Sequence, residues 1–287
     1  MSRPCELCGC DVPPRPLYPS RQIVKCPDCG LVFWDDEADP AEIYDADYFA
    51  GVEYRDYLAD RRILEKNFKR RIRLLRRLAP GGRLLEIGSA YGFFLALARR
   101  YWDAAGVEIA PGPARYAREA LGLDVVAADL LDLPDRTGQY DVICMWDTLE
   151  HLARPVRYIE KAARWLAPGG VLAMTTNDID SFVARIRGRK WRQIHPPTHM
   201  FYFSRRTLAA AVAAAGLTLL AVSCVGYYRS YRSMLHRLLA GPSRDLPRKK
   251  TRWLYHLLTL AGRLDLPIYL NLRDIVLVTA QKPARPS

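Results

Sequence analysis

Short apolar runs alternate with amphipathic stretches from Arg83 to the C-terminus. The apolar runs, which we expect to be strands, are RLLEIG, AAGVEI, VVAADL, YDVICMW, GVLAMTT, LTLLAVSCV and DIVLVTAQK. The intervening FFLALARRY, PARYAREAL and VRYIEKAARWLAPGG carry apolar residues at helical spacing. This alternation is typical of βαβ units. The pattern therefore predicts an α/β fold of Rossmann-like type, a mostly parallel sheet with helices on both faces.

Two further helical segments are predicted outside this alternation. Before the first strand, apolar residues recur at helical spacing at Ile63, Leu64, Phe68, Ile72, Leu75 and Leu78. Residues 36–80 are therefore expected to form a helical lead-in that covers a cofactor. A second, basic amphipathic segment at about 227–265 is expected as an insertion within the main domain, residues 81–287.

The stretch from Leu208 to Tyr228 contains no charged residue, and a run of that length is long enough to span a bilayer. Gly216 divides it into an Ala-rich half with helical character and a half rich in β-formers. We therefore expect a buried helix followed by a core strand rather than a membrane span.

Two C-x2-C pairs mark residues 1–35 as a separate zinc-ribbon-like module. Cys5 and Cys8 form one pair, and Cys26 and Cys29 the other, at a separation typical of four-cysteine zinc sites. Four thiolates leave no open coordination position, so the expected zinc is structural. Cys10 is an alternative ligand in place of Cys8, or else a free thiol.

The chain is strongly basic, with 43 Lys and Arg against 31 Asp and Glu and a net charge of +12. This surplus would attract nucleic acid or an anionic lipid surface, although a basic solvated surface explains it equally well. The N-terminus has no apolar stretch after its first charges, so we expect no secretory signal peptide. The expected location is the cytoplasm, with peripheral contact at the inner membrane face as a further option.

A glycine-containing bend follows the first strand of the main domain. Glu86 ends the apolar run, and Gly88 and Gly92 follow before the next helix. Glycines at such a turn let the backbone approach a ligand closely. A dinucleotide-binding loop would read G-x-G-x-x-G, whereas here a carboxylate precedes the bend. That carboxylate would repel a pyrophosphate and hold an ammonium, which favours a cationic amino-acid cofactor.

Two more carboxylates are expected at the carboxyl ends of the next strands. Glu108 ends the second strand, where it could accept hydrogen bonds from both hydroxyls of a ribose. Asp129 follows the third strand and could accept one from an adenine amine. All three carboxylates would then share the edge of the sheet where ligands bind in open α/β folds.

The segments LLEIGSAYGFF, GVEI, AADLLDLP, YDVICMWDTLEHL and LAPGGVLAMTTND resemble, in order, the motifs of class I S-adenosylmethionine-dependent methyltransferases. The resemblance covers about residues 40–282. It implies that Glu86 and Gly88 contact the methionine end of the cofactor, Glu108 the ribose and Asp129 the adenine, with Trp146 to Thr148 beside the sulfonium. The full expected cofactor site is Glu86, Gly88, Ser89, Ala90, Gly92, Glu108, Ile109, Asp129, Leu130, Trp146 and Asp147.

The string from Asp147 to His151 and the later segment from His199 to Ser204 resemble the ubiquinone-biosynthesis O-methyltransferases. Histidine suits removal of a hydroxyl proton, so His199 is the first candidate for general base and His151 the second. Alternatively, either histidine only holds a loop. A sharper alternative is a second divalent metal held by Asp147, Glu150, His151 and His199.

Zinc-knuckle methyltransferases of bacterial glycan and natural-product pathways look similar at the N-terminus and at YDADYF. The expected function is therefore O-methylation of a small-molecule, glycan or lipid-linked acceptor. One alternative is an RNA 2′-O-methyltransferase, since small-RNA methyltransferases resemble the acidic-x-x-E-H string, although no RNA-binding module is recognisable. The other is a non-catalytic zinc-ribbon interaction protein on a methyltransferase scaffold.

Overall fold

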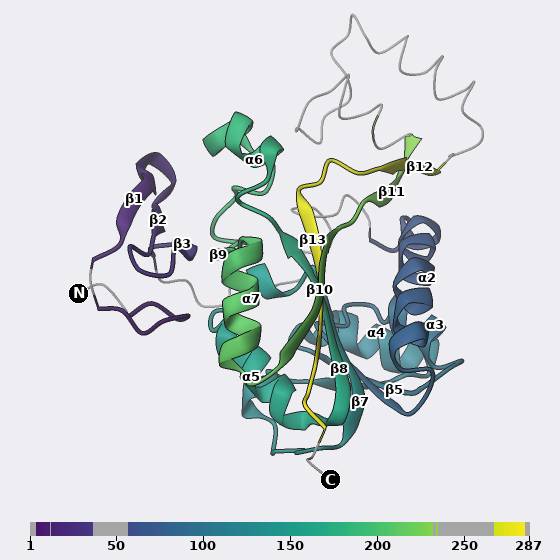
Figure 1. Ribbon diagram of the computed structural model, residues 1–287. Coiled ribbons are helices and arrows are strands. Elements are labelled where there is room, and N and C mark those ends of the chain that lie inside the picture. The colour runs from purple at the N-terminus through teal and green to yellow at the C-terminus, as the bar shows by residue number, and fades with distance from the viewer. Residues whose placement is uncertain (1–3, 12, 37–56, 232–233, 235–266, 285–287) are drawn as a thin grey trace, which may run out of the picture.

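The computed structural model describes residues 4–284 apart from 12, 37–56, 232–233 and 235–266. Its centre is a seven-stranded sheet in the order β10-β13-β8-β7-β4-β5-β6 (Figure 1). The strands are β4 Arg83–Ile87, β5 Asp103–Glu108, β6 Asp124–Ala127, β7 Tyr140–Trp146, β8 Leu166–Asn177, β10 Thr218–Cys224 and β13 Ile275–Gln281. Strands β4 to β8 are parallel, and β13 runs antiparallel to both β8 and β10. The predicted mostly parallel Rossmann-like sheet is confirmed.

Helices cover both faces of this sheet. On one face lie α2 Arg61–Leu78, α3 Phe93–Ala98 and α4 Pro111–Leu121, and on the other α5 Pro155–Trp165 and α7 Arg205–Ala214 (Figure 1). Each face buries its own apolar cluster, as expected for parallel strands covered on both sides. A short helix, α6 Phe182–Arg187, follows β8, and the 3-10 turns are η1 Pro19–Arg21, η3 Leu130–Asp132, η4 Leu149–His151 and η5 Gly188–Lys190.

The N-terminal module forms a second sheet with a strand borrowed from the main domain. Strands β1 Arg15–Tyr18, β2 Ile23–Lys25 and β3 Val32–Trp34 are followed in the sheet by β9 Phe201–Tyr202. Strand β9 pairs antiparallel with β3, and buried residues of the module join the core cluster that includes α5 and α7. The module is thus packed into the domain rather than tethered to it.

Part of the predicted lead-in and insertion can be placed. Helix α2 lies where the apolar spacing predicted it, but residues 37–56 of the lead-in lie outside the described residues. The insertion predicted as helical begins instead with a strand, β11 Tyr227–Ser230, which pairs antiparallel with β12 Pro267–Leu270 and lies against α2. Most of the rest of that insertion lies outside the described residues.

The uncharged stretch from Leu208 to Tyr228 is divided mainly between α7 and β10, as Gly216 predicted. Gly216 has a φ of +74°, in the left-handed region that favours glycine, and it ends the helical half. Within the described ranges, no helix combines the length and the apolar character needed to cross a bilayer.

Candidate active site and metal centre

The bend after β4 has the backbone conformation that the glycine spacing predicted. Gly88, Ala90 and Gly92 all have positive φ, at +74°, +46° and +76°. A Cβ added to Gly88 would lie 2.5 Å from the Cγ2 atom of Thr148, so no larger side chain fits there without displacing Thr148. The bend therefore exposes its backbone at the carboxyl end of β4, next to the segment that follows β7.

Glu108 braces this bend from the end of β5. Its Oε2 accepts a hydrogen bond from the backbone N–H of Ala90 at 2.7 Å, and its Oε1 accepts one from that of Ala110 at 2.9 Å. Each carboxylate oxygen can accept more than one hydrogen bond, so both retain capacity for a ligand hydroxyl. Ile109, the next residue, is 37% exposed and presents an apolar surface beside the carboxylate.

Glu86 is a buried carboxylate in need of a partner. Only 3% of the residue is exposed, and its pKa is raised well above the usual value by burial and then by the negative charge of Glu108. Its Oε2 and the Oγ of Ser89 are buried and have no hydrogen-bond partner among the described residues. A buried acceptor of this kind is costly unless a donor reaches it, and a ligand ammonium would supply both donors and charge.

Replacing Glu86 with glutamine is expected to stabilise the ligand-free protein at about pH 8, on the order of 1–3 kcal/mol. A carboxyl whose folded pKa is raised contributes stability at low pH and loses it as pH rises toward the folded pKa. The gain over wild type should therefore shrink at about pH 5. Thermal melts at the two pH values measure this, with Asp103→Asn, an exposed carboxylate at the start of β5, as control.

The same variant should nevertheless bind a cationic cofactor more weakly, because the buried charge has been removed. If Glu86→Gln destabilised the protein equally at both pH values, the buried carboxylate would have a structural partner, and its assignment to a ligand would be wrong.

Tyr57 packs against two aromatic residues at the glycine bend after β4. It is buried, and its ring stacks on Tyr91 and Phe93 with centroid distances of 5.5 Å in both cases. Burial raises its pKa, and the charges of Glu86, Glu108 and Asp147 raise it further. The Tyr57 hydroxyl therefore stays protonated at neutral pH. The sequence predicted a cover in this segment but did not single out this residue.

Arg71 is the clearest site residue that the sequence did not indicate. It lies on α2 among apolar neighbours and is only 7% exposed. Its guanidinium carbon is 5.5 Å from the centre of the Trp146 ring and 5.3 Å from that of Tyr227. Its side chain has no ion pair or hydrogen bond among the described residues. A buried arginine in that state suits a ligand carboxylate, which a guanidinium binds with two parallel hydrogen bonds.

The carboxylate predicted after the third strand is already engaged. Asp129 Oδ1 accepts hydrogen bonds from the Leu131 backbone N–H at 2.7 Å and from the Tyr158 hydroxyl at 2.5 Å, and it caps η3. Leu130 is almost fully buried beside it. Asp129 keeps its second oxygen, so the adenine contact stays a prediction.

Asp147 occupies a strained position directly after β7. Its φ is +53°, and its backbone N–H donates to the Thr175 carbonyl and hydroxyl oxygens at 3.0 and 3.1 Å. The buried Tyr227 hydroxyl is within 2.7 Å of Oδ1 and 2.6 Å of Oδ2. Burial and the Asp147 charge raise the pKa of Tyr227, so this phenol donates to the carboxylate and holds it in place. Strained residues of this kind cluster at functional sites.

The two histidines proposed as bases lie together with Glu150. Ligand atoms of Glu150, His151 and His199 all lie within 4.8 Å of one another, and the three residues are buried. Asp147 is not part of this group. His151 Nδ1 is 2.9 Å from the Thr198 carbonyl oxygen, and His199 Nδ1 is 3.0 Å from that of Gln193. A carbonyl accepts only from a protonated nitrogen, so Nδ1 carries a proton in both rings, and Asn177 Nδ2 lies 3.3 Å from the His199 Nδ1 as well.

His199 is neutral in this environment. Burial lowers its pKa well below the usual value, and the nearby His151 and His195 lower it further. Glu150 accepts hydrogen bonds from Thr176 at 2.7 Å and from Asn177 at 3.2 Å. The neutral His199 imidazole, fixed through Nδ1 beside His151 and the Glu150 carboxylate, belongs to a donor set that fits a divalent cation. A neutral imidazole is also suited to accept a proton.

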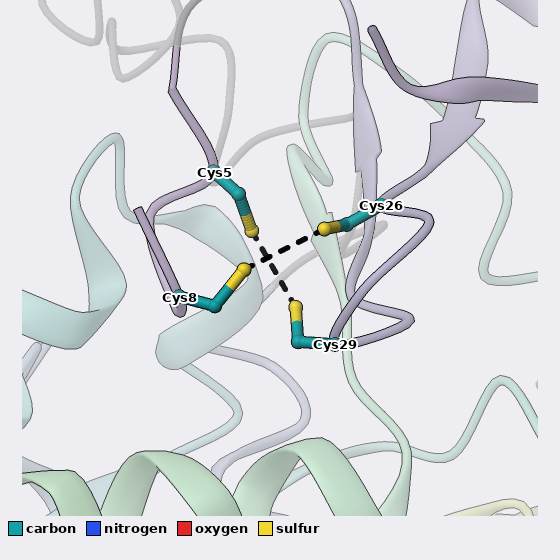
Figure 2. Close-up of side chains that lie close together, drawn as sticks. All are labelled: Cys5, Cys8, Cys26 and Cys29. Atoms are coloured by element: carbon teal, nitrogen blue, oxygen red, sulfur yellow. Dashed lines mark hydrogen bonds between the residues drawn. The ribbon is translucent and has the colours of Figure 1, made fainter. Parts of the chain in front are cut away.

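The four cysteines of the two C-x2-C pairs converge, as Figure 2 shows. Cys5 Sγ is 3.5 Å from Cys29 Sγ, and Cys8 Sγ is 3.6 Å from Cys26 Sγ. Zinc–sulfur bonds of about 2.3 Å in a tetrahedron put neighbouring sulfurs about 3.8 Å apart, so these residues fit a four-thiolate zinc. Cys10 lies outside the four-cysteine group.

The turns that present the sulfurs follow the predicted knuckle pattern. Gly9 and Gly30 have φ of +69° and +75°, and each donates its N–H to the carbonyl of the first cysteine of its pair. The Leu31 N–H points at Cys29 Sγ at 3.4 Å. Positive φ at the residue after the knuckle is what turns these amides inward.

Backbone hydrogen bonds connect the cysteine module to the histidine cluster. The Trp34 N–H donates to the Met200 carbonyl at 2.8 Å, and the Met200 N–H donates to the Glu150 carbonyl at 2.9 Å. Arg206 Nη2 donates to the Cys29 carbonyl at 2.6 Å. These hydrogen bonds therefore hold the segment that carries His199 between the N-terminal cysteine module and η4.

Comparison with known proteins identifies the domain. Residues 57–222 match the family described as a methyltransferase domain. Over 207 residues the chain is 29% identical to a ubiquinone biosynthesis O-methyltransferase of Azorhizobium caulinodans, covering 68% of this chain and 79% of that protein. A malonyl-[acyl-carrier protein] O-methyltransferase of Methylococcus capsulatus is 30% identical over 61% of this chain and 67% of its own length.

Other matches agree on the domain. Protein MJ1123 of Methanocaldococcus jannaschii is 33% identical over 48% of this chain. The match covers 64% of MJ1123, which is less than two thirds of that protein's length. The structure of the YcgJ protein of Bacillus subtilis superimposes with a TM-score of 0.53 at 17% identity, covering 76% of this chain and 98% of that one, which shows the shared fold. The family match covers more than half of the sequence, and its motifs follow in the predicted order. The chain therefore belongs to the methyltransferase domain family and, with it, to the S-adenosylmethionine-dependent methyltransferases.

Proposed function

We propose that this protein transfers a methyl group from S-adenosylmethionine to an oxygen of a small-molecule, glycan or lipid-linked acceptor. The observation that carries the proposal is the buried Glu86 carboxylate with an unpartnered oxygen, beside a glycine bend that Glu108 braces. The O-methyltransferase names of two relatives support the choice of oxygen as the methylated atom. When bound, S-adenosylmethionine supplies a methyl group that its sulfonium has already activated for displacement.

The charged residues of the cradle match the charges of this cofactor. Its methionine moiety carries an ammonium and a carboxylate, which we assign to Glu86 and Arg71. Glu108 would accept the ribose hydroxyls at the end of β5, where acidic residues hold ribose in related α/β folds. The backbone from Gly88 to Gly92 would line the cofactor, with Ser89 Oγ as a further donor or acceptor. Ile109, Leu130 and Asp129 would surround the adenine.

The acceptor side is formed by the segments after β7 and β8. Trp146 and Asp147 would border the reacting centre, and the Tyr227 hydroxyl holds the Asp147 carboxylate in place through hydrogen bonds. His199 is our first candidate for removing the acceptor proton, since its Nε2 keeps a lone pair at neutral pH, and His151 is the second. A divalent cation at Glu150, His151 and His199 is the alternative, and it would lower the pKa of an acceptor hydroxyl.

We further propose that Cys5, Cys8, Cys26 and Cys29 bind one structural zinc ion. Four thiolates complete the coordination of the metal, so it would take no direct part in methyl transfer. Its role would be to fold the N-terminal module and thereby support the segment that carries His199.

The test combines substrate capture with a cofactor-site variant. Purified protein is incubated with methyl-labelled S-adenosylmethionine and either a lipid or a water-soluble cell extract, and labelled products are identified by mass spectrometry. We expect an O-methylated product from wild type. The Arg71→Met variant should bind the cofactor at least about tenfold more weakly, because a charged hydrogen-bond pair is lost. The exposed Arg73→Met variant on the same helix is the control.

Labelled products on nitrogen or carbon only would contradict the proposed chemistry. Unchanged cofactor affinity in Arg71→Met would contradict the assignment of Arg71 to the cofactor carboxylate. It would not affect the assignment of the chain to the methyltransferase family.

A further inference from the structure

Three large apolar side chains are exposed to solvent beside α6 rather than packed into a core. Phe182 is 78% exposed, Ile186 68% and Leu272 49%, the highest values for large hydrophobic residues in the described part of the chain. Phe182 and Ile186 are one helical turn apart, and Phe182 and Leu272 line the same open pocket. Clustered exposed apolar side chains of this kind mark interaction sites.

Helix α6 presents Phe182 and Ile186 to solvent, and its fold is stabilised by local hydrogen bonds. Its first turn is capped by Ser181, whose Oγ accepts a hydrogen bond from the Ala184 N–H at 3.2 Å. Among the residues of α6, only Ala184 is buried. Phe182 and Ile186 therefore contribute little to folding, and Figure 1 shows α6 projecting beyond the helices that cover the sheet.

Positive charge surrounds the apolar group. Within residues 182–190, the exposed basic side chains are Arg185, Arg187, Arg189 and Lys190, and Arg273 follows Leu272. Two of the nearby carboxylates are buried and already paired: Asp178 with Arg205 at 3.2 Å and Asp274 with Arg192 at 3.3 Å. The exposed Asp180 lies 3.9 Å from Arg185, so it offsets part of the charge of one basic residue. We call residues 182–190 with Leu272 and Arg273 the α6 surface.

The α6 surface lies at the same edge of the sheet as the proposed active site. Strand β8 runs parallel to β4, β5 and β7, and α6 follows its carboxyl end. Glu86, Glu108 and Asp147 lie at or beside the carboxyl ends of those neighbouring strands. A partner bound at α6 is thus next to the acceptor side.

We propose that the α6 surface docks the protein on an anionic lipid bilayer. Phe182 and Ile186 enter the boundary between headgroups and acyl chains, and the surrounding cations contact lipid phosphates. The interfacial region of a bilayer provides both requirements together, apolar depth and negative charge. This inference rests on the proposed function, because docking would bring a lipid-linked acceptor from the membrane to the active site.

The test is co-sedimentation of the full-length, zinc-loaded protein with vesicles. Phosphatidylcholine vesicles are compared with vesicles of equal parts phosphatidylcholine and phosphatidylglycerol. Wild type should sediment with the anionic vesicles only. Phe182→Ser with Ile186→Ser should lower binding at least about tenfold, since two buried apolar side chains are lost. Arg185→Glu with Arg187→Glu should lower it by a similar factor.

The matched control is Arg73→Glu with Arg77→Glu, which makes the same charge change on the exposed face of α2. The control should bind nearly as well as wild type. Absence of binding to both vesicle types would overturn the proposal and leave an acidic protein as the fitting partner. Equal losses in the α2 and α6 charge variants, or no loss in Phe182→Ser/Ile186→Ser, would also overturn it. Calorimetry with S-adenosylmethionine on each variant separates this outcome from failure of the proposed function.

Discussion

Replacing Glu108 with alanine is expected to weaken the binding of S-adenosylmethionine about 100-fold or more. Two effects combine in this variant. A ribose would lose a charged acceptor for two hydroxyls, and each such hydrogen bond contributes about 1.5–3 kcal/mol. The bend would also lose its brace, because the Ala90 and Ala110 N–H groups donate to the same carboxylate.

Glu108→Gln separates these two effects. Its amide oxygen can still accept one backbone N–H, so the bend should be better preserved while the charge is lost. We expect an intermediate affinity by calorimetry, with the thermal stability of the ligand-free protein close to that of wild type. Glu119→Ala, which removes an exposed carboxylate on α4, should bind normally. Wild-type affinity in Glu108→Ala would show that the ribose lies elsewhere.

Replacing Cys26 with serine is expected to abolish zinc binding and to unfold the N-terminal module. A structural zinc contributes on the order of 10 kcal/mol to a module that folds around it, which far exceeds what so small a core could replace. Metal analysis should find one zinc per wild-type chain and none in the variant. Limited proteolysis should then cleave within residues 4–36 before the main domain.

Cys10→Ser is the matched control for this prediction, because Cys10 lies in the same module but outside the four-cysteine group. It should retain one zinc per chain. The effect of Cys26→Ser on function should fall on the acceptor side, since β3 pairs with β9 and Trp34 binds Met200 next to the His199 segment. Cofactor affinity should change less than about threefold. Zinc retained in Cys26→Ser and lost in Cys10→Ser would reassign the ligands.

The sheet and the glycine bend after β4 could be predicted because their signals are local. Parallel strands buried on both faces appear as continuous apolar runs, and β4, β5 and β7 all lie where those runs predicted them. The bend at Gly88 and the knuckles at Gly9 and Gly30 depend on backbone conformations that glycine adopts at low cost, so their positive φ values could also be expected.

The remaining features depend on contacts between distant segments. Strand β9 has only two residues, and its partner β3 lies far away in sequence, so nothing local marks it as part of the cysteine module. Arg71 is at helical spacing from Phe68 and Leu75, on the buried face of α2. From the sequence alone, a single arginine in this basic helix is expected to be solvent-exposed, even though its spacing places it on the apolar face.

The contact between Tyr227 and Asp147 also joins segments that are far apart in the sequence. Tyr227 lies in a segment whose basic and aromatic composition predicted a helix, but its pairing with β12 makes it a strand residue that reaches the end of β7. Pairing of this kind is decided by tertiary packing, which overrides local preference.

The proposed S-adenosylmethionine site is tested most directly by equilibrium dialysis of the zinc-loaded protein with the labelled cofactor, comparing wild type with Glu86→Gln and Glu108→Ala. We expect saturable binding of one molecule per chain to wild type and strongly weakened binding to both variants. Failure of wild type to bind at millimolar concentration, or equal binding to all three proteins, would contradict the proposed site.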